Sequence, residues 1–198
     1  CNAEQSKPSI SDCRFTDNHG TEFGGAILCL SDVEMLLTES SFSANTATLG
    51  GAVYTDLATS DISGCAFEAN AATQGGAIFQ NGDGLTSSRF TTCAFTANTA
   101  AENAGAVMIS LDAEPLLLQC SFDANTAEIF GGAVLCQLSA EPLIHRCLIT
   151  GNSAALGGGI AAYEAAPVVT SSLIVRNIAP TGAGVVSSAS STVLSNCT

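Results

Sequence analysis

Apolar residues recur along this chain at the short steps of β-strands, separated by polar turns and glycine pairs. In the copy of the pattern that begins at Cys120, Cys120 and Phe122 are two residues apart and therefore point to the same side of an extended strand. Another apolar residue stands three positions before the Cys or Ser of every copy, and this odd step requires a bend or bulge between the two. A third apolar position follows each glycine pair. The pattern predicts three short strands and three corners per copy.

An asparagine marks every copy, five residues after the Cys or Ser, and successive asparagines lie 25 to 28 residues apart. A fixed period in this range indicates one supersecondary unit stacked on copies of itself. The strands are too short and too often interrupted by glycine for the helices of leucine-rich or ankyrin repeats. We therefore expect an all-β chain that forms a parallel β-helix (β-solenoid) of about seven coils. The asparagines are Asn18, Asn45, Asn70, Asn98, Asn125, Asn152 and Asn177.

These asparagines are expected to form a structural ladder at one corner of the coils. A side-chain amide both donates and accepts, so stacked asparagines can hydrogen-bond along the column, and Asn also tolerates left-handed backbone angles. Glycosylation is the alternative, but none of the seven stands in an N-x-[S/T] sequence; the one formal sequon is Asn196-Cys197-Thr198. The glycine pairs are expected at another corner, where φ is positive or the backbone lies too close to its neighbour for a side chain.

The charge of the chain excludes several classes of partner. Its 198 residues carry a formal net charge of −13 with only five basic residues, so no basic groove for nucleic acid is expected. No stretch approaches the ~20 apolar residues of a membrane-spanning helix, so this segment is not expected to insert into a membrane. The repeats run from end to end, and we expect residues 1–198 to form a single β-helix domain. Because neither end shows a polar capping repeat, we expect this domain to be a fragment of a longer solenoid.

Nine cysteines occur, most of them in the inward column that opens the motif. An odd number leaves at least one thiol unpaired within the chain. Pairs in adjacent coils, such as Cys65 with Cys93, satisfy the distance for a disulfide, but their parallel Cβ vectors would strain the bond. We expect mainly buried, free thiols, with disulfides between adjacent coils as the alternative. No C-x-x-C sequence is present, and no metal site is expected.

The residue pattern offers no catalytic constellation. His19 and His145 are both expected to face solvent, and neither has an evident Asp and Ser partner. Pectin-degrading β-helix enzymes are similar to one another in N-T-D, D-D, G-H-G and R-x-K elements; here the N-T steps read N-T-A and the other three elements are absent. We expect no catalytic residues and no cofactor, and a carbohydrate-active enzyme is the least favoured of three hypotheses.

Coil length varies almost wholly between the glycine pair and the next Cys. The longest such segment contains Asn81-Gly82-Asp83-Gly84. Insertions in solenoids gather on one face, which is often the binding face. Asn81, Gly82, Asp83 and Gly84 are therefore the candidate contact loop.

The paired motifs resemble the repeats of the chlamydial polymorphic outer-membrane proteins, in which F-x-x-N is followed by G-G-A-[I/L/V]. The clearest copies are Phe42–Asn45 with Gly50–Val53, and Phe122–Asn125 with Gly131–Val134. The resemblance covers all seven coils and weakens in three of them: the fourth (Ala104-Gly105-Ala106), the sixth (Gly157-Gly158-Gly159) and the seventh (Ile174, Gly182-Ala183-Gly184). It implies a right-handed β-helix passenger, exported as an autotransporter and acting in adhesion.

We therefore expect an extracellular, cell-surface, non-enzymatic scaffold segment of an adhesin-like protein. The partner would be a host-cell or matrix protein or a glycan. The alternative, from the structural class, is a subunit of an extracellular filament or surface layer that stacks end to end through exposed strand edges.

Overall fold

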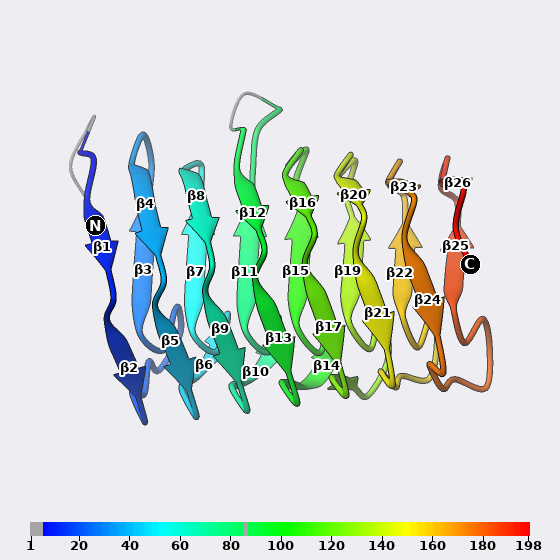
Figure 1. Cartoon of the computed structure of the whole chain (residues 1–198), viewed down its shortest axis with the longest axis horizontal. Coiled ribbons are helices and arrows are strands. Elements are labelled where there is room, and N and C mark those ends of the chain that lie inside the picture. The colour runs from blue at the N-terminus through cyan, green and yellow to red at the C-terminus, as the bar shows by residue number, and fades with distance from the viewer. Residues whose placement is uncertain (1–5, 85–86) are drawn as a thin grey trace.

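Parallel strands build the entire described chain, which comprises residues 6–84 and 87–198 of a computed structural model. Figure 1 shows the coils side by side along the long axis of the molecule, in sequence order from the N-terminal to the C-terminal end. Each strand pairs in parallel with its equivalents in the adjacent coils, and the strands at the two ends of a sheet have one such neighbour. The predicted parallel β-helix of about seven coils is therefore confirmed.

Four sheets run along this β-helix, and we number them in the order in which a coil visits them. Sheet 1 has eight strands and contains the apolar residue three positions before the Cys or Ser. Its strands are β1 (Ser9–Ser11), β4 (Glu34–Thr38), β8 (Thr59–Ser63), β12 (Arg89–Thr91), β16 (Leu116–Leu118), β20 (Leu143–His145), β23 (Val168–Thr170) and β26 (Val193–Ser195).

Sheet 2 has seven strands and contains the Phe or Ile of each copy. Its strands are β2 (Arg14–Thr16), β5 (Ser41–Ser43), β9 (Ala66–Glu68), β13 (Ala94–Thr96), β17 (Ser121–Asp123), β21 (Leu148–Thr150) and β24 (Leu173–Val175).

Sheet 4 has seven strands and follows the glycine pairs. Its strands are β3 (Ile27–Leu30), β7 (Val53–Asp56), β11 (Ile78–Asn81), β15 (Val107–Ser110), β19 (Val134–Gln137), β22 (Ile160–Tyr163) and β25 (Val185–Ser188).

Sheet 3 lies between sheets 2 and 4 and corrects the prediction of three strands per coil. It has four short strands, β6 (Thr46–Leu49), β10 (Ala71–Gln74), β14 (Thr99–Asn103) and β18 (Thr126–Ala127), in the segment that the sequence presents as a polar turn. The inward alanines of this segment are small enough to let it lie flat on the interior: Ala100 and Ala127 are buried against each other and Ala154. Four coils therefore carry a fourth strand.

A stack of phenylalanine rings forms the centre of the core. Consecutive rings from Phe15 to Phe122 have centroids 4.7–4.9 Å apart and interplanar angles of 3–10°. Ile149 and Ile174 continue the column on sheet 2. The inward residues of sheets 1 and 4 pack around this stack in one continuous cluster.

A second apolar cluster lies outside sheet 4, and the sequence pattern did not reveal it. Tyr54, Phe79, Met108 and Leu135 point away from the main core, yet each is at most 6% exposed. Residues that precede the glycine pairs, such as Phe130, pack against them because the chain folds back at the glycine corner. Sheet 4 is therefore covered on both faces.

The corners correct one expectation about asparagine. None of the seven repeat asparagines has a positive φ; the residue immediately before each one does, with Ala69 at 52° and Ala97 at 53° as examples. The residue before each Cys or Ser is also left-handed, for instance Gln119 at 54°, and this is the predicted corner between sheets 1 and 2. The asparagine side chain stabilises the turn, while its neighbour adopts the strained backbone angle.

Both features expected of the glycine pair are present: the first glycine has a positive φ, and the second lies too close to the neighbouring backbone to carry a side chain. The first glycine has a positive φ, as at Gly75 (64°), and Ala104 takes this place in the next coil at 60°. The second glycine has no room for a side chain, because a Cβ on Gly76 would overlap the carbonyl oxygen of Gly105 in the next coil. The glycine corner is therefore a site of backbone-to-backbone stacking.

Candidate functional site

The asparagine ladder is the most regular array of polar side chains in the molecule. Each Nδ2 donates to the Oδ1 of the next asparagine along the column, at 2.8–3.0 Å. Each Oδ1 from Asn45 onwards also accepts from the backbone N–H of the preceding asparagine, as in the 3.0 Å bond from Asn70 to Asn98. From Asn45 onwards, the Nδ2 group also donates to a carbonyl oxygen of sheet 2, for instance from Asn98 to Phe67 at 2.9 Å.

This bonding leaves the ladder no capacity for a ligand. Asn45, Asn70, Asn98, Asn125 and Asn152 are fully buried. A side-chain amide offers two donor hydrogens, and both are used within the column. The ladder is therefore a scaffold element, and a binding site must be formed by other residues.

The candidate contact loop is only partly available to a partner. Asn81 and Gly82 are buried, because Gly82 donates its N–H to the carbonyl oxygens of Ser110 and Leu111 in the next coil, each at 3.2 Å. Asn81 Nδ2 donates to the Tyr54 hydroxyl at 3.1 Å. Asp83 and Gly84 are exposed, and the described part of this connection extends beyond the loops of the neighbouring coils (Figure 1). Contact through this loop would therefore involve Asp83 and Gly84.

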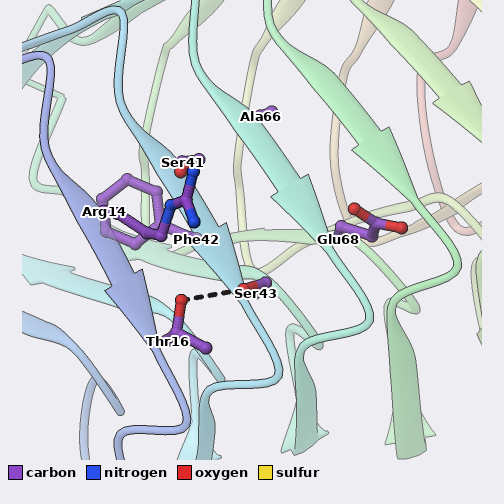
Figure 2. A pocket seen from close by; sticks show the side chains of 7 residues that line it. All are labelled: Arg14, Thr16, Ser41, Phe42, Ser43, Ala66 and Glu68. Atoms are coloured by element: carbon purple, nitrogen blue, oxygen red, sulfur yellow. Dashed lines mark hydrogen bonds between the residues drawn. The ribbon is translucent and has the colours of Figure 1, made fainter.

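A depression of about 340 Å³ lies on the outer face of sheet 2, across β2, β5 and β9 (Figure 2). Arg14 and Glu68 stand at opposite ends of it, with Ser41 and Ser43 between them. Thr16 Oγ1 and Ser43 Oγ share a hydrogen bond of 3.0 Å. Hydroxyl groups beside one cation and one anion make a shallow surface that suits polar contacts.

A similar depression of about 320 Å³ lies on the outer face of sheet 1 in the same coils. There Lys7 Nζ and Glu34 Oε2 form an ion pair at 2.6 Å, beside Leu36 and Asp61. Both partners are more than half exposed, so the pair adds little to stability. The N-terminal coils thus present two neighbouring depressions with charged residues at each, which the sequence pattern did not single out because these residues do not repeat.

The two histidines bind hydroxyl groups of the following coil. His19 is exposed, as expected, and its Nδ1 lies 2.7 Å from Thr46 Oγ1. His145 was expected to be exposed but is half-buried, because the outer face of sheet 1 places it beside Thr170 Oγ1 at 2.7 Å. Each histidine therefore has a hydroxyl partner in place of the carboxylate that a catalytic triad requires.

Most described cysteines are buried free thiols. Six of the eight are buried; Cys13 is exposed and Cys197 half-buried. Burial raises the pKa of Cys65 to about 11 and that of Cys136 to about 12. Hydrogen bonds with the thiols of Cys147 and Cys93, together with burial, raise the pKa of Cys120. The raised pKa values make Cys65, Cys120 and Cys136 small core side chains and not nucleophiles.

Native alkylation is expected to distinguish these thiols. Because the thiolate is the nucleophile, iodoacetamide at pH 8 should modify Cys13 rapidly and leave Cys65 and Cys136 unmodified. Peptide mass spectrometry resolves the sites, and labelling in urea provides the control in which all three react. Modification of Cys136 at the rate of Cys13 in the folded chain would contradict this burial.

Stability is expected to fall in alkali. The thiol of Cys136 ionises near its ordinary pKa of 9.0 when unfolded but only at about 12 when folded, so its contribution is complete below pH 9 and is lost as the pH rises towards 12. The loss is about 1.4 kcal/mol per pH unit for each such thiol. Urea unfolding at pH 8 and pH 10 under reducing conditions measures it. Cys136→Ala, which matches Ala162 in the next coil, should show a shallower decline; an unchanged decline would exclude Cys136 as its source.

The described part of the chain contains neither a cluster of metal-ligating side chains nor a helix suited to crossing a membrane. Residues 6–84 and 87–198 contain no group of three or more His, Cys, Asp or Glu side chains that could hold a metal ion. They also contain no helix with the length and apolarity needed to span a bilayer.

Comparison with known protein families fits this geometry. Residues 26–198 match the family model described as the right-handed β-helix region. The chain belongs to the right-handed β-helix family. Residues 12–30 of this β-helix protein also match the Chlamydia polymorphic membrane protein repeat, which confirms the resemblance seen in the motifs. That match spans Phe15–Asn18 and Gly24–Ile27, one complete copy. No curated protein and no solved structure was found to match the β-helix chain.

Proposed function

We propose that this β-helix is a non-enzymatic scaffold segment of a surface-exposed, adhesin-like protein of the autotransporter-passenger type. The polymorphic membrane protein repeat and the right-handed β-helix fold support a surface protein of this kind. The partner would be a host-cell or matrix protein or a glycan, bound on the outer faces of the coils. The net charge of −13 makes a nucleic acid an unsuitable partner.

One observation carries the proposal: the side chains of the repeated residues are buried or hydrogen-bonded within the β-helix and are not available to a partner. The Phe column is stacked in the core, the Asn column is bonded within itself, and the second glycines stack against backbone. What varies from coil to coil lies on the outer faces, such as Arg14 and Glu68 in the depression of Figure 2 and Asp83 in the loop after β11. A rigid stack with variable outer faces is suited to display and contact, as in other solenoids.

Adhesion of coated particles tests this proposal. Fluorescent beads carrying the chain should bind cultured epithelial cells, immobilised matrix proteins or a glycan array in a saturable manner. Arg14→Glu and Asp83→Lys, which change outer-face charges, should weaken binding in chains that circular dichroism shows to be folded. Absence of binding on all three surfaces would contradict an adhesive role. Turnover of a glycan that is lost on Asp83→Ala would overturn the non-enzymatic assignment.

The filament hypothesis stays a prediction. Imaging of the purified chain distinguishes a filament subunit from a separate passenger segment. Negative-stain electron microscopy of the purified chain should show short separate rods if the chain is a passenger segment. Uniform long fibres would favour the end-to-end filament over the passenger segment.

A further inference from the structure

Two inward columns face each other inside the β-helix, at the end where the chain passes from sheet 4 to sheet 1. In the coil that contains β3 and β4, Cys29 Sγ and Met35 Sδ are 3.6 Å apart. In the coil that contains β25 and β26, the equivalent Ser187 Oγ and Thr192 Oγ1 are 2.9 Å apart. The register of the sheets carries these two columns through every coil between them. Side chains at these positions therefore meet across the interior.

In two successive coils both columns are polar. Thr55 and Ser60 occupy the positions in the coil of β7 and β8, and Gln80 and Ser88 occupy them in the coil of β11 and β12. All four are at most 2% exposed. The coil before them has Cys29 and Met35 at these positions, and the coil after them has Ile109. The four side chains thus form a buried polar cluster between apolar layers, which we call the polar chamber.

Most polar atoms of this chamber have no hydrogen-bond partner. Thr55 Oγ1, Ser60 Oγ and both amide atoms of Gln80 are buried and unpartnered. Ser88 Oγ is the exception, because it accepts the backbone N–H of Ser60 at 3.0 Å. A buried polar group without a partner costs about 1–3 kcal/mol, so four such atoms in neighbouring residues require a common partner.

We propose that this chamber is an internal hydration site, in which ordered water bridges the Gln80 amide to the hydroxyl groups of Thr55 and Ser60. Water both donates and accepts, and a buried water typically makes about three hydrogen bonds to groups of this kind. Every group in the chamber is neutral, and the buried polar residues of the described chain include none with a charge, so the chamber does not favour an ion. The polar column here is a binding site for water in the core of the scaffold.

Two measurements on the folded chain test this assignment. A crystal structure at high resolution should show water within about 2.7–3.2 Å of the Gln80 amide and of at least one of the two hydroxyls. Oxygen-17 magnetic relaxation dispersion counts long-lived internal waters, and Gln80→Met should lower that count by at least one. Gln74→Met is the matched control, because Gln74 bonds Glu102 in an exposed pair, and it should leave the count unchanged.

Either of two results would overturn the hydration site. One is a dry chamber in which the Gln80 amide bonds Thr55 and Ser60 directly. The other is an unchanged count of long-lived waters in Gln80→Met. If Gln80→Met does not fold, the presence or absence of water beside the Gln80 amide in the electron density of the unsubstituted chain decides between the two.

Discussion

Gly76→Ala is expected to destabilise the β-helix by more than about 4 kcal/mol, a loss that is exceptional for a single methyl group. The added Cβ would overlap the carbonyl oxygen of Gly105 and lie 2.6 Å from that of Thr99, both in the next coil. Backbone atoms cannot rotate away as a side chain can, so relief requires the two coils to separate. Urea unfolding followed by circular dichroism measures the loss.

Gly84→Ala is the matched control for this prediction. Gly84 has a φ of 74° but nothing lies within 4 Å of its added Cβ, so the cost should be limited to the left-handed backbone, about 1–2 kcal/mol. Equal unfolding midpoints for the two variants would contradict close stacking at the glycine corner.

Asn98→Ala is expected to cost about 3–5 kcal/mol, because it removes four hydrogen bonds from a fully buried site. Asn98 Oδ1 accepts from the backbone N–H and the Nδ2 of Asn70, and Asn98 Nδ2 donates to Phe67 and to Asn125. The substitution would leave the buried Asn70 N–H without its partner and would remove one of the bonds to the Phe67 carbonyl. The free energy of unfolding in urea measures the cost.

Asn18→Ala provides the control within the same column. Asn18 is exposed, and its side chain makes one bond, from Nδ2 to Asn45 Oδ1 at 2.8 Å. Its loss should cost about 1 kcal/mol or less. If Asn98→Ala were as mild as Asn18→Ala, the interior ladder would not stabilise the fold.

The repeated columns made the fold predictable from the sequence. A period-two step from Cys120 to Phe122 and an odd step before it were sufficient to place two strands and the corner between them. The ladder of asparagines could also be anticipated, because a short side-chain amide both donates and accepts and can therefore bond the next amide along the column. Because the coils stack, each inward or corner position of the motif recurs as a column, and all seven copies support the same strand and corner assignment.

Features that depend on how the coil folds back on itself were not predictable. The outer cluster around Tyr54 and Met108 requires the segment before the glycines to lie against sheet 4, and no periodicity records that contact. Sheet 3 was interpreted as a turn because its strands consist mainly of Thr, Ala and other small or polar residues and lack the large apolar column of the other sheets. Left-handed angles at Ala69 and Ala97 were missed because alanine gives no signal for a positive φ.

The candidate contact surface was only partly predictable. Length variation pointed to the loop after β11, yet Asn81 and Gly82 are held by the next coil. The depressions on the outer faces of sheets 1 and 2 involve residues that do not repeat, and a pattern of repeats cannot single them out. The proposed contact function therefore rests on positions where the coils differ.

Hydrogen exchange of the asparagine side-chain amides tests the central claim, that the repeat is an interior scaffold, most directly. In the 19.9 kDa chain, NMR spectroscopy should find the Nδ2 protons of Asn45, Asn70, Asn98, Asn125 and Asn152 strongly protected from exchange with solvent. Those of Asn196, which is exposed and outside the ladder, should exchange rapidly. Rapid exchange at all six asparagines would contradict a buried ladder and, with it, the scaffold role of the repeat.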